Sequence, residues 1–99
     1  MDIQINSVRF DADKKLLDFV DQKVNKLGQF NDQILSAEVF LRLSKSENAE
    51  NKVAEIKLDI PGAPLFAKKQ SKTFEEAVDL SADALKIQIT RQKEKQRGA

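Results

Sequence analysis

The residue types that usually carry enzyme chemistry are scarce in this chain. Cysteine and histidine are both absent, which removes thiolate nucleophiles, imidazole bases, disulfides and the usual zinc ligands. The sequence also contains no glycine-rich phosphate loop, no Gly-x-Ser-x-Gly turn and no His-Glu-x-x-His motif. We therefore expect a protein that is not an enzyme and holds no cofactor.

One acidic pair has the spacing of a metal site. Asp79 and Asp83 stand one helical turn apart, so their carboxylates could hold a divalent cation together. Acidic pairs in the first turns of a helix are more commonly solvated charges that complement the helix dipole. We therefore expect no metal at this pair, and an ordered cation there would revive the enzyme hypothesis.

The distribution of charge is the main functional signal. The chain has 17 basic and 16 acidic residues, and a net charge of +1 neither favours nor excludes a polyanionic partner. Residues 73–83 contain four acidic and no basic side chains, whereas residues 84–99 contain five basic and one acidic side chain. This division complements a helix dipole in part. The basic end is also a candidate binding surface.

A basic stripe becomes visible when the last segment is drawn as a helix. At about 100° per residue, Lys86, Lys93 and Arg97 lie in one stripe beside its apolar face. Lys23 and Lys26 end an earlier predicted helix, so two helices could share one basic surface. Lysine and arginine contacts to phosphate give salt-dependent binding with little sequence reading. Nucleic-acid binding is therefore one hypothesis from the residues alone.

A second apolar line on the same helix supports a different hypothesis. Ala77, Leu80, Ala84 and Ile87 lie roughly opposite the face that should cover a sheet. Burial against the first helix is the commoner explanation for such a line, and an exposed line would be a partner surface. The alternative function is therefore a protein-interaction or self-association domain that uses Leu80 and Ile87.

The candidate residues need elements to position them, and the first two are clear. Alternating apolar residues over residues 3–8 predict a strand. Apolar residues recur every three or four positions over residues 16–27, which predicts a helix with Asp13 as its N-cap. Gly28 should end this helix in the left-handed conformation.

Three more strands should follow. Alternation predicts long strands over residues 35–43 and 54–60, joined by a polar hairpin loop over residues 44–51. The Pro61-Gly62 pair should force the next turn, before a weaker strand over residues 65–69.

A long helix should complete the chain. Thr73 and Glu76 have the spacing of a capping box, which marks a helix start. The helix should fade into a basic tail from about residue 91. Its sheet-facing side is predicted to hold Phe74, Val78, Ala82, Leu85 and Ile89.

The element order βαβββα predicts the α+β class in a single domain, 1–99. A right-handed crossover makes the first two strands parallel, in a four-stranded mixed sheet with two helices on one face. The other face should lie in water, with Phe40 and Phe66 as apolar exceptions. These rings could stack on bases, although cross-strand aromatic pairs more often only stabilise a sheet.

Composition predicts a soluble cytoplasmic protein with no membrane partner. The chain is 40% hydrophobic and 33% charged, and no apolar run approaches the roughly 20 residues of a spanning helix. The N-terminus lacks the basic-then-apolar layout of a signal peptide.

Three segments carry a family resemblance. They are LLDFVDQKVNKLGQF at 16–30, KLDIPGAPLFA at 57–67 and TFEEAVDLSADALKIQITRQKEK at 73–95. In this order and spacing they resemble the ribosome hibernation-promoting factors and ribosome-associated translation inhibitors, also labelled sigma-factor modulation proteins. The resemblance covers nearly the whole chain.

The resemblance implies a fold like that of double-stranded-RNA-binding domains. It also implies a function in the regulation of translation. Such a protein lodges in the mRNA and tRNA channel of the small ribosomal subunit, inhibits translation and promotes hibernation under stress or in stationary phase. Its partner is ribosomal RNA, and no DNA is expected. The matching basic positions, joined with the basic stripe, give the predicted RNA-binding set: Lys23, Lys26, Lys86, Arg91, Lys93, Lys95 and Arg97.

This chain departs from the family pattern in two respects. Ala84 and Ile87 stand where the family often has Lys and Arg, so we expect weaker or redirected binding. Besides Lys86, the residues that could compensate are Lys68, Lys69 and Lys72. Long members also carry a C-terminal domain that pairs ribosomes, so any pairing by this chain should need a separate dimerising factor.

Overall fold

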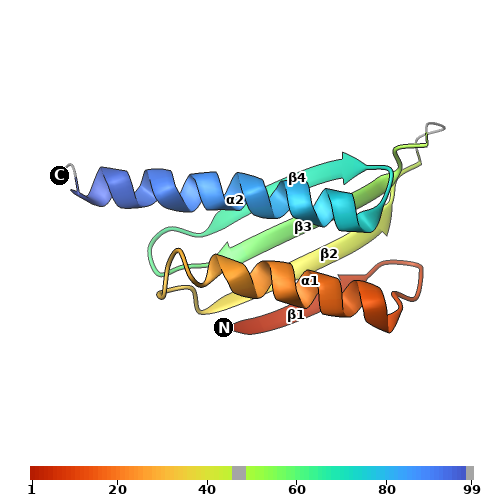
Figure 1. Ribbon diagram of the computed structural model, residues 1–99, viewed down its shortest axis with the longest axis horizontal. Helices are drawn as coiled ribbons and strands as arrows, with labels where there is room; N and C mark the ends of the chain where they lie inside the picture. Colours follow the sequence, from red (N-terminus) through yellow and green to blue (C-terminus); the bar gives the residue numbers. More distant parts are fainter. Residues whose placement is uncertain (46–48, 98–99) are drawn as a thin grey trace.

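The computed structural model describes residues 1–45 and 49–97 and has the predicted α+β architecture. Its elements run in the order βαβββα (Figure 1). Their bounds are β1 Asp2–Ser7, α1 Lys14–Leu27, β2 Ser36–Leu43, β3 Lys52–Asp59, β4 Leu65–Ser71 and α2 Phe74–Arg97. The centre of the predicted hairpin loop, residues 46–48, and the last two residues of the predicted domain lie outside the described residues.

The four strands form one mixed sheet in the order β1-β2-β3-β4. β1 pairs with β2 in parallel, as the crossover through α1 predicts, and the other two pairs are antiparallel. Because side chains alternate along a strand, Ala37, Val39 and Leu41 of β2 point to the helices. Their pairing partners on β3 are Leu58, Ile56 and Ala54.

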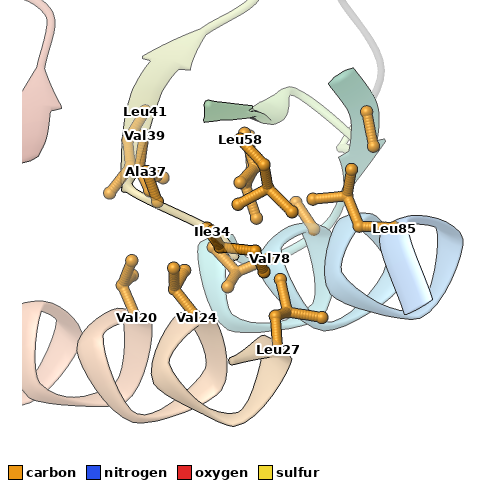
Figure 2. Packing of buried hydrophobic residues seen from close by; sticks show 14 of the residues in the cluster. Val20, Val24, Leu27, Ile34, Ala37, Val39, Leu41, Leu58, Val78 and Leu85 are labelled. Carbon is orange, nitrogen blue, oxygen red and sulfur yellow. The ribbon is translucent and has the colours of Figure 1, made fainter. Parts of the chain in front are cut away.

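Both helices cover one face of the sheet. α2 packs over β3 and β4, and α1 lies beside it on the β1 side (Figure 1). Apolar side chains from α1, β2, β3 and α2 meet between the helices and the sheet (Figure 2). The predicted sheet-facing side of α2 is confirmed, since Phe74, Val78, Ala82, Leu85 and Ile89 are all buried.

The two helix starts follow the predicted capping chemistry. The Asp13 side chain accepts a hydrogen bond of 2.9 Å from the Leu16 backbone N–H. The Thr73 hydroxyl accepts one of 3.1 Å from the Glu76 N–H, which is one half of a capping box. These bonds fix where each helix begins, and therefore which side chains face the sheet.

The conformation predicted for Gly28 is wrong, although the helix does end there. Its φ of −62° is right-handed. Backbone bonds of 3.1 Å from Gly28 to Asn25, from Gln29 to Lys26 and from Phe30 to Leu27 tighten the last turn. Such i→i+3 bonds satisfy the free carbonyls without a left-handed residue.

The Pro61-Gly62 turn is confirmed. Gly62 has a φ of +76°, and the Ala63 N–H donates to the Ile60 carbonyl over 3.0 Å. Proline at the second position and a positive φ at the third define a type II turn. This turn reverses the chain between β3 and β4.

α2 is long enough to leave the sheet. Its 24 residues correspond to about 36 Å at 1.5 Å per residue, and its C-terminal turns project past the strands (Figure 1). Both faces of this projecting segment can therefore meet a partner. In the described part of the chain, neither helix is long and apolar enough to cross a membrane.

Candidate nucleic-acid interface

A groove between the two helices brings together three of the seven predicted basic residues. Lys23, Lys26 and Lys86 line a hollow of about 170 Å³, together with Phe30 and Asp79. The hollow also includes Asp83. We call this hollow the interhelical groove. α1 and α2 run side by side in the same direction (Figure 1), which places the end of α1 against the middle of α2.

Lys23 forms an ion pair with an acidic neighbour in the groove. Its Nζ lies 2.9 Å from the Asp79 carboxylate, and its side chain is 32% exposed. The hydrogen bond and charge of Asp79 raise the pKa of Lys23 above its ordinary value, and the charge of Asp83 adds to this effect. Lys23 therefore stays protonated at any physiological pH, with part of its charge already compensated.

The two other lysines of the groove are more available. The Lys86 ammonium lies 4.9 Å from the centre of the Phe30 ring, which holds it by a cation–π contact without neutralising it. Lys26 is exposed and forms no ion pair with any described residue. The groove therefore presents two cations and a third that is shared with Asp79.

The remaining predicted residues do not all lie on this side of α2. Lys93 is exposed and follows Lys86 by seven positions, so it continues the groove along the projecting end of the helix. Arg91 and Lys95 line a hollow of about 380 Å³ with Leu65 on the β4 side. Arg91 also lines a separate hollow on α2 together with Lys86 and Ile87. Arg97 lies in α2, and its side chain is not among those described.

The proposed compensating lysines on β4 lie elsewhere. Lys68 is on the open sheet face, 3.9 Å from the Glu55 carboxylate. Lys69 is exposed near the end of β4, and Lys72 is exposed between β4 and α2, at the opposite end of α2 from Arg91. They extend the basic surface along one edge of the sheet, but they do not fill the interhelical groove.

The acidic pair of α2 has a neighbour that the sequence did not reveal. Asp79 is engaged by Lys23, so its carboxylate already has a cation. Within the described ranges, no group of three or more metal-ligating side chains comes together. The structure thus gives this pair an electrostatic role within the groove.

The aromatic residues of the open sheet face differ in their availability. The Lys57 ammonium lies 5.6 Å from the centre of the Phe40 ring and covers it. Phe66 is 47% exposed. Base stacking at Phe66 stays a prediction, whereas Phe40 would first have to lose its lysine.

The expected burial of the second apolar line is wrong for two of its four residues. Leu80 is 42% and Ile87 is 53% exposed, while Ala77 is fully buried and Ala84 partly buried. The reason is the place of α1, which packs against the flank of α2 that carries Asp79 and Lys86. The line therefore faces solvent and the β4 side.

Two residues of the groove were missed by sequence reasoning. Phe30 lies in the segment that carries the family resemblance, but its contact with Lys86 depends on how α1 and α2 are aligned. The pairing of Asp79 with Lys23 depends on the same alignment. No periodicity within one helix encodes the register between two helices, so no signal in a single sequence could have found them.

Comparison with known proteins places this geometry in context. The model of a family described as "Sigma 54 modulation protein / S30EA ribosomal protein" matches residues 3–97. A ribosome hibernation promoting factor of Azotobacter vinelandii is 31% identical over 96 residues, which cover 97% of this chain and 86% of that protein. A factor of the same name from Pseudomonas putida is 29% identical over 96 residues, covering 97% and 90%.

Two solved structures share the fold. The N-terminal domain of Protein Y from Thermus thermophilus aligns with a TM-score of 0.79 at 26% identity, covering 92% of this chain and 98% of that one. A ribosomal subunit interface protein from Coxiella burnetii aligns with a TM-score of 0.83 at 22% identity, covering 94% and 98%. The second likeness supports the fold alone.

Proposed function

We propose that this chain, which belongs to the sigma 54 modulation protein / S30EA ribosomal protein family, binds the ribosome and promotes hibernation. In more detail, we propose that it occupies the mRNA and tRNA channel of the small subunit and so inhibits translation under stress or in stationary phase. The proposed location is the cytoplasm, and a separate ribosome-dimerising factor is the proposed further partner. Inhibition by occupancy requires no chemistry from the chain.

The observation that carries this proposal is the convergence of Lys23, Lys26 and Lys86 in one groove. These residues come from two helices and are distant in sequence, yet they line one hollow beside Asp79 and Asp83, and Lys93 follows Lys86 two turns later along α2. A row of lysines binds successive phosphates and reads shape, with little sequence preference. RNA folded around a channel offers such phosphates.

Asp79 competes with RNA phosphate for one lysine of the proposed interface. A phosphate that approaches Lys23 competes with the Asp79 carboxylate, 2.9 Å from the same ammonium. Like charges so close repel each other, so the phosphate must either displace the carboxylate or bind mainly to Lys26 and Lys86. We propose that Lys26 and Lys86 make the first contacts.

Channel occupancy is tested by competition. Small subunits are loaded with mRNA and tRNA before the protein is added, and bound protein is measured after sedimentation. We expect binding to empty subunits and its loss on loaded ones, with parallel inhibition of a cell-free translation reaction. Equal binding to loaded and empty subunits would exclude the channel, while leaving ribosome binding itself intact.

The exposure of Leu80 and Ile87 favours a second candidate function, self-association. An antiparallel pair of α2 helices centred near Ala84 would bring Leu80 of one copy against Ile87 of the other. The same pairing would place Glu76 against Arg91, so the acidic start of one helix meets the basic end of the other. A two-fold interface of this kind is self-complementary.

Sedimentation equilibrium separates the two candidates. If self-association is the function, Ile87→Glu should abolish a dimer that persists at high salt, because apolar contacts hardly weaken there. RNA binding should instead fall steeply with ionic strength. A monomer at all concentrations would remove the second candidate.

A further inference from the structure

A second cluster of cations lies at the end of the sheet away from the C-terminus of α2. Arg9, Arg42 and Lys45 line a hollow of about 470 Å³, together with Val8, Leu43 and Ser44. We call it the sheet-end hollow. Among the lining residues that the structure describes, none carries a carboxylate. α1 separates it from the interhelical groove, because Arg9 precedes the start of α1 and Lys26 lies in its last turn (Figure 1).

Arg9 has an unusual backbone conformation. Its φ of +64° is left-handed, a region that costs free energy for any residue with a bulky side chain. In the described part of the chain, Arg9 is the only residue other than glycine with a positive φ. Asparagine or glycine would hold this position with less strain. The stability of the fold therefore does not explain why an arginine stands at this position.

The neighbours of Arg9 hold it in place. The Val8 N–H donates a 2.8 Å hydrogen bond to the Leu41 carbonyl, which ties the chain to β2. The Phe10 ring stacks on Phe74, with centroids 4.7 Å apart and planes at 7°. Anchors on both sides fix the backbone between them, so the exposed Arg9 side chain is held at the hollow. Strain that the surroundings enforce is typical of binding sites.

The hollow retains positive charge. Arg42 pairs with Glu55, but Glu55 also lies 3.9 Å from Lys68, so one carboxylate serves two cations. Arg9 and Lys45 form no ion pair with any described residue. Arginine presents a planar fork of N–H donors that matches phosphate oxygens. The exposed apolar side chains of Val8 and Leu43 flank these donors.

We propose that the sheet-end hollow binds a phosphate group of an RNA strand, with Arg9 as the main contact. This inference rests on the proposed function in one respect, that the ligand is RNA. The two cationic sites lie at different ends of α1, whose 14 residues span about 21 Å at 1.5 Å per residue. Two phosphate contacts so far apart would hold two segments of RNA and fix the orientation of the protein between them.

Replacing Arg9 by asparagine gives a sharp test, because the change should act oppositely on stability and binding. Asparagine tolerates the left-handed region, so Arg9→Asn should raise Tm by a few degrees. The same variant should bind small subunits several-fold more weakly at low salt. The slope of log affinity against log salt should decrease by about 0.7 to 0.9, the value of one phosphate contact. Arg9→Lys should restore most of the slope.

Lys15→Gln is the matched control. It removes one positive charge from an exposed position of α1 that lines neither site, and it should leave both affinity and slope unchanged. A rise in Tm for Arg9→Asn with wild-type affinity and slope would overturn the proposal. A fall in Tm would also count against it, because the strain argument would then be wrong.

A second measurement separates this inference from the proposed function. A short RNA duplex is titrated into a variant with Lys23, Lys26 and Lys86 changed to alanine, and backbone amide shifts are followed by NMR. Shifts at Arg9 and Lys45 in this variant would support an independent phosphate site even if small subunits were not bound. Wild-type binding to subunits with no shift at Arg9 or Lys45 would keep the proposed function and remove this site.

Discussion

At the level of single residues, Asp79 controls how Lys23 presents its charge. The carboxylate raises the pKa of Lys23 by a hydrogen bond and by its charge, so Asp79→Asn should lower that pKa toward its ordinary value. Side-chain NMR of Lys23 over an alkaline titration measures the change. The variant should also bind RNA more tightly, because it removes a carboxylate that competes with phosphate. Weaker binding would mean that Asp79 positions Lys23 for its ligand.

The same pair gives a pH dependence of stability with a definite sign. A raised pKa means that the folded chain holds the Lys23 proton more tightly than the unfolded chain. The stabilisation is present at neutral pH and is lost as the pH rises through the folded pKa, which lies above the ordinary value for lysine. Urea unfolding of wild type and Asp79→Asn should therefore show a difference in unfolding free energy that shrinks at strongly alkaline pH. A constant difference would contradict this pKa shift.

The contact between Lys86 and Phe30 is a second effect of single residues. With the ammonium 4.9 Å from the ring centre, the coupling should be about 0.5–1 kcal/mol at this exposed position. A double-mutant cycle of Lys86→Met and Phe30→Leu, followed by urea unfolding, isolates it from the loss of packing. Additive effects of the two changes would show that the contact contributes nothing.

At the level of elements, the sequence predicted what each segment becomes more reliably than how its ends are shaped. Alternation identified β2 and β3 because each has one face against the helices and one toward solvent. Gly28 correctly marked the end of α1. The left-handed conformation predicted for it was wrong, because i→i+3 hydrogen bonds satisfy the last carbonyls without it. Several geometries can satisfy a helix end, and a single glycine does not choose among them.

Gly62 shows the opposite case, where the turn type fixes the residue. A φ of +76° and open space around the position mean that an added Cβ would meet backbone strain and no clash. Gly62→Ala should destabilise the fold by about 1 kcal/mol, and Gly62→Asn should cost less. Chemical denaturation of both variants tests the order. Equal losses of stability in the two variants would contradict backbone strain at Gly62 as the cause.

At the level of the whole molecule, the topology could be predicted and the groove could not. The order of elements and the crossover rule determine which strands pair. The groove depends on the alignment of α1 with α2, and that alignment comes from core packing among residues such as Val24, Leu27 and Val78. This is why Lys23 and Lys86 were predicted as basic residues of two helices, while Asp79 and Phe30 were absent from the predicted site.

The most direct test of the account is the salt dependence of binding to small ribosomal subunits. Purified protein is sedimented with subunits across a salt series, beside an interhelical-groove variant with Lys23, Lys26 and Lys86 changed to alanine. A matched control changes Lys14, Lys15 and Lys52 to alanine, which removes the same charge away from the groove and leaves Lys57 over Phe40. We predict steep salt dependence for wild type and control, and a slope lower by about 0.7 to 0.9 per lost contact for the groove variant. Equal slopes for all three proteins, or no binding at low salt, would contradict the account.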